Sequence, residues 1–93
     1  MPKNKSVEFM LTFVQDYLDG ETERCFFDMD FDHYFIQHYP SMERFNSSLA
    51  ECFAFYLSEE GIDRSESLSD GEHKRLIRRQ YKKFLAAMKD GFY

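Results

Sequence analysis

Apolar side chains near the start of the chain recur at intervals of three and four residues, which is the spacing of one helix face. This face consists of Val7, Met10, Leu11, Val14, Tyr17 and Leu18. Ser6 is a favourable N-cap residue ahead of it, and Gly20 can adopt the left-handed conformation that ends many helices. The pattern predicts a helix near residues 7–19.

A similar face occurs late in the sequence and consists of Ile77, Tyr81, Phe84, Leu85 and Met88. Ser69 and Glu72 precede it at the spacing of a capping box, in which the two residues bond to each other's backbone amide. Gly91 is the candidate C-cap residue. We therefore expect a helix near residues 70–90.

The segment from Thr22 to Pro40 carries two patterns at once. One helical face would hold Phe27, Phe31, Tyr34, Phe35 and His38. Apolar and acidic residues also alternate from Phe27 to Asp32, which is the period of a strand. Length favours a helix near residues 22–39, because strands usually span about 4–8 residues; a strand within residues 26–35 is the alternative. The helix is expected to end at Pro40, since the residue before a proline disfavours helical geometry.

Ser41 is the expected cap of a third helix near residues 42–59. Its apolar face would consist of Phe45, Leu49, Cys52, Phe53, Tyr56 and Leu57. Gly61 follows, and residues 60–69 have no periodicity and many loop formers, so they are expected to form a loop. Four such helices with short connections predict an all-α fold, a single-domain antiparallel four-helix bundle covering residues 1–93.

Composition excludes several classes of protein. A chain of 93 residues has the length of one domain, and no apolar run approaches the about 20 residues of a membrane span. The first residues lack the apolar region of a secretory signal, so we expect a cytoplasmic protein without a membrane partner. Cys25 and Cys52 are too few for a disulfide framework and are expected to be reduced and buried.

The net charge of −5 is distributed unevenly. Residues 1–73 contain 16 acidic and 5 basic side chains, whereas residues 74–93 contain seven basic side chains and one acidic. The bases of the fourth helix include Lys74, Arg75, Arg78, Arg79, Lys82 and Lys83. They could pair with acids on neighbouring helices, or they could bind phosphates. A small nucleic-acid-associated regulator that binds through the basic fourth helix is therefore one hypothesis, although the acidic remainder would repel a polyanion.

Six acids and a single base occupy the stretch from residue 59 to residue 72. The acids are Glu59, Glu60, Asp63, Glu66, Asp70 and Glu72. An acidic loop on an acidic body can imitate a chain of phosphates and dock on a protein that grips RNA or DNA. The alternative is that these acids keep the loop soluble and complement the dipole of the fourth helix.

Sequence patterns of catalytic and metal sites are missing from the chain. A calcium loop starting at Asp28 would need Gly at its sixth position and Glu at its twelfth, where the chain has His33 and Tyr39. His33 and His38 are five residues apart and cannot bind one zinc ion as an i,i+4 pair does. We expect no enzyme, no catalytic residue, no metal and no cofactor; a small enzyme using His33, His38 or His73 is a third hypothesis.

Several short segments resemble a known family. They are residues 13–21 (Phe-Val-Gln-Asp-Tyr-Leu-Asp-Gly-Glu), residues 61–64 (Gly-Ile-Asp-Arg), residues 68–71 (Leu-Ser-Asp-Gly), and the last helix through Arg78 and Lys83-Phe84. In these segments the chain resembles the small helical immunity proteins related to the colicin D immunity protein, which include partners of contact-dependent growth inhibition toxins.

The resemblance implies a four-helix bundle that binds a cognate bacterial toxin and covers its transfer-RNA-cleaving site with acidic side chains. Its matching positions here are Glu59, Asp63 and Asp70. The leading hypothesis is therefore an immunity protein that binds a cognate nuclease toxin domain, as a monomer in a 1:1 complex, without contacting nucleic acid itself.

Overall fold

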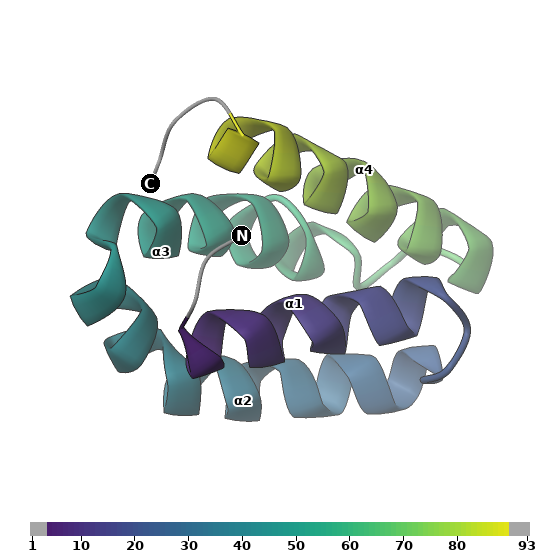
Figure 1. The fold of residues 1–93 in the computed structure, drawn as a ribbon. Coiled ribbons are helices and arrows are strands. Elements are labelled where there is room, and N and C mark those ends of the chain that lie inside the picture. The colour runs from purple at the N-terminus through teal and green to yellow at the C-terminus, as the bar shows by residue number, and fades with distance from the viewer. Residues whose placement is uncertain (1–3, 90–93) are drawn as a thin grey trace.

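Six helical segments follow one another in the computed structural model, which describes residues 4–89 (Figure 1). They are α1 (Lys5–Leu18), α2 (Arg24–Phe45), α3 (Ser47–Phe53), the π-helical segment η1 (Ala54–Glu59), the 3-10 turn η2 (Ile62–Arg64) and α4 (Asp70–Lys89). Residues 4–89 contain no strand, so the expected all-α class is confirmed and the strand alternative for residues 26–35 is wrong. Among these helices, none has both the length and the apolar character that a membrane crossing requires.

The ends of α1 show how local chemistry sets a helix boundary. The expected cap Ser6 is wrong, because the Asn4 side chain accepts hydrogen bonds from the amides of Ser6 and Val7 at 3.0 and 3.1 Å. Ser6 lies inside the helix, where its hydroxyl contacts Nδ1 of His38 at 2.9 Å. At the other end, Gly20 has a φ of 87°, which confirms the left-handed turn predicted there.

The second helix does not end at Pro40, and this is the main error of the sequence-based prediction. Ser41 is not a cap: α2 continues to Phe45, where the extended backbone of Asn46 ends it. The continuation buries Met42 completely, which stabilises the fold by about 1.5–3 kcal/mol. That gain offsets most of the roughly 3 kcal/mol that a proline costs inside a helix.

The predicted third helix is consequently shorter and starts later. Asn46 caps it by accepting from the amide of Leu49 at 3.1 Å, so α3 begins at Ser47 rather than near residue 42. Phe45, expected on its inner face, instead ends α2 and is exposed. The helical path continues through η1, and Gly61 follows it, where a Cβ atom would lie 2.5 Å from the Leu57 carbonyl oxygen. Only glycine therefore fits this turn.

The core of residues 4–89 combines aliphatic side chains with stacked and edge-on rings, and all four α-helices contribute rings to it. Phe53 lies at its centre, with ring centroids 6.3 Å from Phe31 and 5.2 Å from Phe84. The predicted faces of α1 and α4 are buried, apart from Leu85 at the edge of the α4 face. In Figure 1, α2 packs against α1 and α3 and forms the edge of the molecule farthest from α4.

The start of α4 agrees with the predicted capping box. The Glu72 carboxylate accepts from the Ser69 amide at 3.1 Å, and the Glu72 amide donates to the Ser69 hydroxyl at 3.3 Å. The Ser69 hydroxyl also donates to the Glu72 carboxylate at 2.8 Å, and this bond, followed by the bond from the Ser69 amide, lowers the pKa of Glu72. The predicted C-cap Gly91 lies outside the described residues.

Candidate functional site

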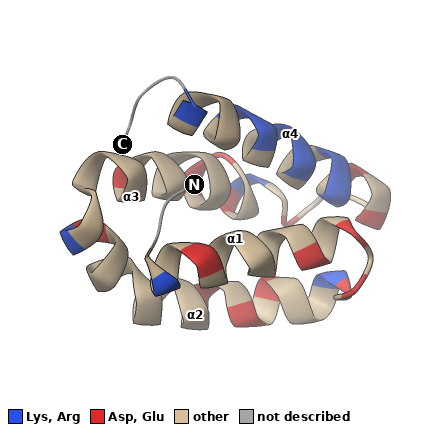
Figure 2. Cartoon of the chain, viewed as in Figure 1, with Lys and Arg blue, Asp and Glu red and all other residues tan. Residues whose placement is uncertain are grey.

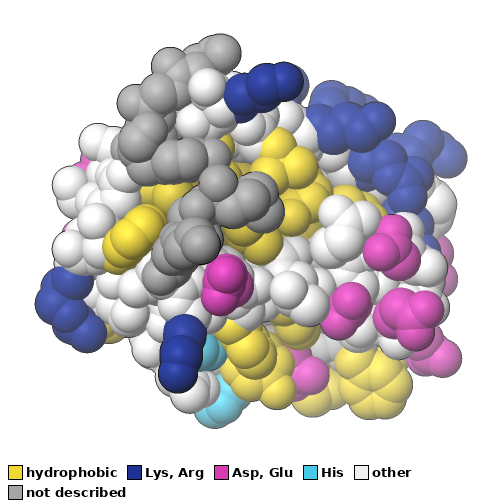
Figure 3. Space-filling view, viewed as in Figure 1, with side chains coloured by type: hydrophobic (Ala, Val, Ile, Leu, Met, Phe, Trp, Pro, Cys, Tyr) yellow, Lys and Arg dark blue, Asp and Glu magenta, His cyan; other side chains and the backbone are white. Residues whose placement is uncertain are grey.

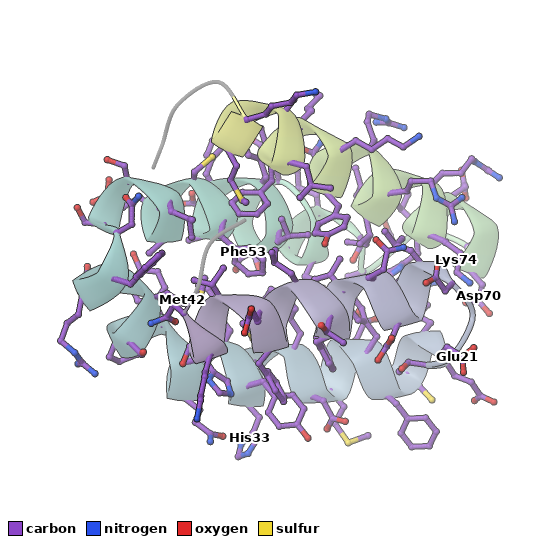
Figure 4. The ribbon with its side chains drawn as sticks, in the orientation of Figure 1. Glu21, His33, Met42, Phe53, Asp70 and Lys74 are labelled. Atoms are coloured by element: carbon purple, nitrogen blue, oxygen red, sulfur yellow. The ribbon has the colours of Figure 1, made fainter. Side chains whose placement is uncertain are left out.

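A cleft of about 830 Å³ lies where α1 ends and where α2 and α4 begin. One wall comes from the α1–α2 turn and the first turns of α2, and the other comes from the first turns of α4. Its lining includes Gly20, Glu23, Arg24, Asp28, Asp70, Lys74, Arg75 and Arg78. Figure 4 shows Glu21, Asp70 and Lys74 at this end of the molecule. Acidic and basic side chains therefore meet around one cleft.

Arg24 holds the two walls together. Its Nη1 donates to the Leu68 carbonyl at 2.6 Å and to the Asp70 carboxylate at 3.0 Å, and its Nη2 donates to the Ser65 carbonyl at 2.9 Å. Nε lies 3.5 Å from the Asp28 carboxylate. A planar guanidinium with five donors suits several acceptors at once, so this one side chain ties residues 65–70 to the first turn of α2.

Arg24 was not among the site residues predicted from the sequence. The one indication of its role in the sequence is that it is a base in an acidic region, one of five basic residues among the first 73. Apart from Asp28, the partners of Arg24 lie more than 40 positions away along the chain, and three of them are backbone carbonyls, which leave no mark in the sequence.

Behind this cleft, a buried chain of hydrogen bonds links α1, α4 and α2. His73 is fully buried; its Nδ1 lies 2.6 Å from the Tyr17 hydroxyl and its Nε2 lies 2.8 Å from the Asp28 carboxylate. Burial, and after it the Asp28 carboxylate, raise the pKa of Tyr17 to about 12. Tyr17 therefore keeps its proton, and the hydrogen bonds of His73 to Tyr17 and Asp28 join the three helices through side chains.

The three histidines of the enzyme hypothesis do not share a site. His73 lies in the chain just described, His38 stacks on Phe9 with centroids 4.4 Å apart, and His33 is exposed on α2. No group of three His, Cys, Asp or Glu side chains in residues 4–89 is arranged to hold a metal ion. The expectation of buried cysteines is wrong for Cys25, which is exposed, whereas Cys52 is half-buried and burial raises the pKa of its thiol.

The structure separates the six acids predicted as a binding site. Asp70 pairs with Arg24, Glu60 pairs with Arg64 at 2.6 Å, and Glu72 belongs to the capping box. The other three, Glu59, Asp63 and Glu66, are exposed, and no ion pair within residues 4–89 reaches them.

Two acids that were not predicted as site residues lie at the same end of the molecule as Glu66 and Asp70. Glu21 and Glu23 are exposed on the α1–α2 turn, directly before Arg24. The same Arg24 side chain contacts the Asp70 carboxylate and, at 3.5 Å, the Glu66 carbonyl. Arg24 thus joins the start of α2, which follows Glu21 and Glu23, to the segment that carries Glu66 and Asp70, and we call these four acidic residues the acidic end. Figure 2 shows acidic residues on the turn and at the start of α4. The signal for the two missed residues was the acidic run from Asp16 to Glu23.

Lys and Arg recur along α4, as Figure 2 shows in blue, and Figure 3 shows basic side chains in dark blue on the surface over this helix. Lys74 extends over the Tyr17 ring, 5.1 Å from its centroid, and Arg78 donates to the Leu18 carbonyl at 3.0 Å. Exposed positions are held by Arg75, Arg79, Lys82 and Lys83. Within residues 4–89, no ion pair joins a Lys or Arg of α4 to an acid, so the expected pairing with neighbouring helices does not occur there.

Comparisons of the chain with protein-family models, with curated proteins and with solved structures give no match.

Proposed function

We propose that this chain is a non-enzymatic, cytoplasmic inhibitor of the immunity type, which binds a cognate nuclease toxin domain and covers the toxin's phosphate-binding site. The observation that carries the proposal is the acidic end, where Arg24 fixes carboxylate-bearing segments of two separate parts of the chain. The resemblance to the immunity proteins related to the colicin D immunity protein supports it. That resemblance also leads us to propose a single-domain antiparallel four-helix bundle, with α3 and η1 together acting as one bent helix.

A nuclease grips its substrate with positive side chains, since phosphates dominate the affinity for nucleic acid. Carboxylates held in a fixed array can occupy the same positions, and the net charge of −5 accelerates the encounter with a basic domain. Glu21, Glu23 and Glu66 carry this role best because they are exposed, whereas the charge of Asp70 is partly neutralised by Arg24. We propose a monomer in a 1:1 complex, without a metal, cofactor or catalytic residue.

The test uses the basic nuclease domain of a candidate toxin, to be sought at the end of a large secreted protein encoded beside this chain. Reversing Glu21, Glu23 and Glu66 to Lys should weaken binding about 100-fold or more at low salt, measured by isothermal titration calorimetry. The difference in affinity between the wild-type chain and this variant should become smaller as salt rises, because salt screens the charges that cause it.

Matched control variants come from exposed acids elsewhere: Glu8→Lys, Glu43→Lys and Glu51→Lys change the net charge by the same amount. They should weaken binding by less than about 5-fold, since only long-range attraction is altered. Equal losses in both sets of variants would contradict a specific role for the acidic end. Unchanged protection of toxin-exposed cells by the first set would reject the proposal.

A second candidate function is binding of nucleic acid by the outer face of α4, which is favoured by its exposed bases Arg75, Arg79, Lys82 and Lys83, none of which forms an ion pair within residues 4–89. It predicts a salt-dependent affinity for RNA or DNA that is lost when Arg75, Arg79 and Lys83 become Glu. A gel-shift experiment at low salt distinguishes it, because the inhibitor proposal requires no shift with the isolated chain.

A further inference from the structure

α2 has a second apolar face, opposite the face that enters the core. Phe27, Phe31 and Met42 are fully buried on the inner side. On the outer side Phe26, Met29 and Ile36 are 52%, 67% and 73% exposed. With the exposed His33 between them they form what we call the outer α2 stripe, which at 100° per residue covers a sector of about 80°. Figure 4 shows His33 on the side of α2 that faces away from the rest of the molecule.

Such a stripe is unusual on a surface helix, whose outer face is normally polar. Isolated apolar residues on a surface need no explanation, but a row of large ones marks a contact surface. From Phe26 to Ile36 the row extends about 15 Å along the helix at 1.5 Å per residue. Figure 3 shows apolar and histidine side chains gathered along the edge of the molecule where α2 lies.

The charges beside the stripe identify what covers it. At 100° per residue, Asp30 and Asp32 flank the stripe at about 80° to either side of its centre. No Lys or Arg occurs in residues 25–43. A second copy of this chain would bring the same carboxylates against each other, and phosphates of a lipid or nucleic acid would be repelled. The complementary occupant is a protein surface that combines an apolar patch with basic side chains.

The stripe also begins at the acidic end. Glu23 belongs to the acidic end and directly precedes α2, whose first turn carries Phe26. Large apolar side chains beside a charged rim are the usual anchors of a protein interface.

We infer that the outer α2 stripe is the apolar half of the interface with a basic protein partner. The inference rests on the proposed function, in which that partner is the nuclease domain. The acidic end then engages the phosphate-binding site, and the stripe anchors the complex beside it.

The experiment compares two pairs of alanine substitutions in the full chain, with the same nuclease domain as the probe. Met29→Ala with Ile36→Ala removes the two most exposed members of the stripe, which contribute least to the core. We expect Kd to rise at least about 30-fold, as for truncation of interface anchors. This loss should persist at high salt, because contacts between apolar groups are not screened, and that behaviour separates it from the loss caused by charge reversal.

The control pair, Phe55→Ala with Leu85→Ala, truncates side chains that are 45% and 37% exposed on η1 and α4. It should change Kd by less than about 3-fold. A Kd unchanged by the stripe pair, while reversal of the acidic end weakens binding, would overturn this inference and leave the proposed function standing. Failure of the wild-type chain to bind the nuclease domain would overturn both.

Two further measurements identify the other possible occupants. Sedimentation equilibrium of the chain alone should show a monomer; a dimer that Met29→Ala with Ile36→Ala dissociates would assign the stripe to a second copy. Co-sedimentation with phosphatidylcholine vesicles should show no binding. Binding that the same pair of substitutions abolishes would assign the stripe to a lipid surface and overturn the inference.

Discussion

α2 and α4 are the two longest helices of the molecule, and their outer faces differ sharply. α4 buries one apolar face and carries Lys and Arg on the opposite face, as a surface helix usually carries polar residues there. α2 buries Phe27, Phe31 and Met42 but also presents Phe26, Met29 and Ile36 outward. The fold needs only the inner face of each helix. The residues on the outer faces therefore indicate what contacts each helix, and they indicate different surroundings for α2 and α4.

The largest expected effect separates the two faces of α2. Phe31→Ala removes a fully buried ring that packs against Phe53, so unfolding in urea should show a loss of about 3–5 kcal/mol in the free energy of unfolding. Ile36→Ala on the outer face should change it by less than about 1 kcal/mol. Similar losses at both positions would mean that the outer face also supports the fold, and the comparison with α4 would then fail.

A second prediction concerns pH and the attachment of α1 to α4. Burial, followed by Asp28 for Tyr17 and by Asp19 for Tyr81, raises the pKa of each phenol to about 12. Each tyrosine ionises near pH 10 in the unfolded chain but only near pH 12 in the folded protein. The unfolded state thus holds fewer protons in this window, so stability is full below pH 10 and falls between pH 10 and 12, by about 2–3 kcal/mol for each group.

The measurement for the second prediction is urea unfolding at several pH values from 8 to 12. Tyr81→Phe and Tyr17→Phe should each flatten the decline, because phenylalanine does not titrate. The fully buried rings of α2 are phenylalanines, which do not titrate, but α2 adds to this dependence through Tyr39, whose pKa is raised by burial and then by Glu43 and Glu51. An equally steep decline in the variant lacking both phenols would contradict the prediction.

The smallest of the three effects concerns Arg24, which joins the start of α2 to the loop before α4. Arg24→Ala leaves the carbonyls of Ser65 and Leu68 without this donor and should cost about 1–3 kcal/mol. Hydrogen exchange should show faster opening of residues 65–70. Arg64→Ala is the matched control, since it breaks an exposed pair with Glu60 and should cost less than about 1 kcal/mol. Unchanged exchange in Arg24→Ala would argue against its role in ordering the acidic end.

The candidate site was only partly foreseeable. The acids of residues 59–72 were visible as a run of like charges, but their arrangement was not, because ion pairs and a cap occupy three of the six. Glu23 and Glu66 are more than 40 positions apart, and the Arg24 side chain brings their segments together. The sequence of α2 showed a helical pattern and a strand-like pattern at once. Which of its large apolar residues face outward followed only once the structure showed one continuous helix.

The sequence alone determined the all-α class, the faces of α1 and α4, the turn at Gly20 and the capping box at Ser69, because each depends on residues within one or two helical turns. The tertiary structure decided the path through Pro40, the late start of α3 and the acidic end. Those features depend on long-range terms, namely the burial of Met42 and the hydrogen bonds of Arg24. The local pattern around Pro40 indicates what a proline costs inside a helix, but only the packed core supplies the burial energy that offsets most of this cost.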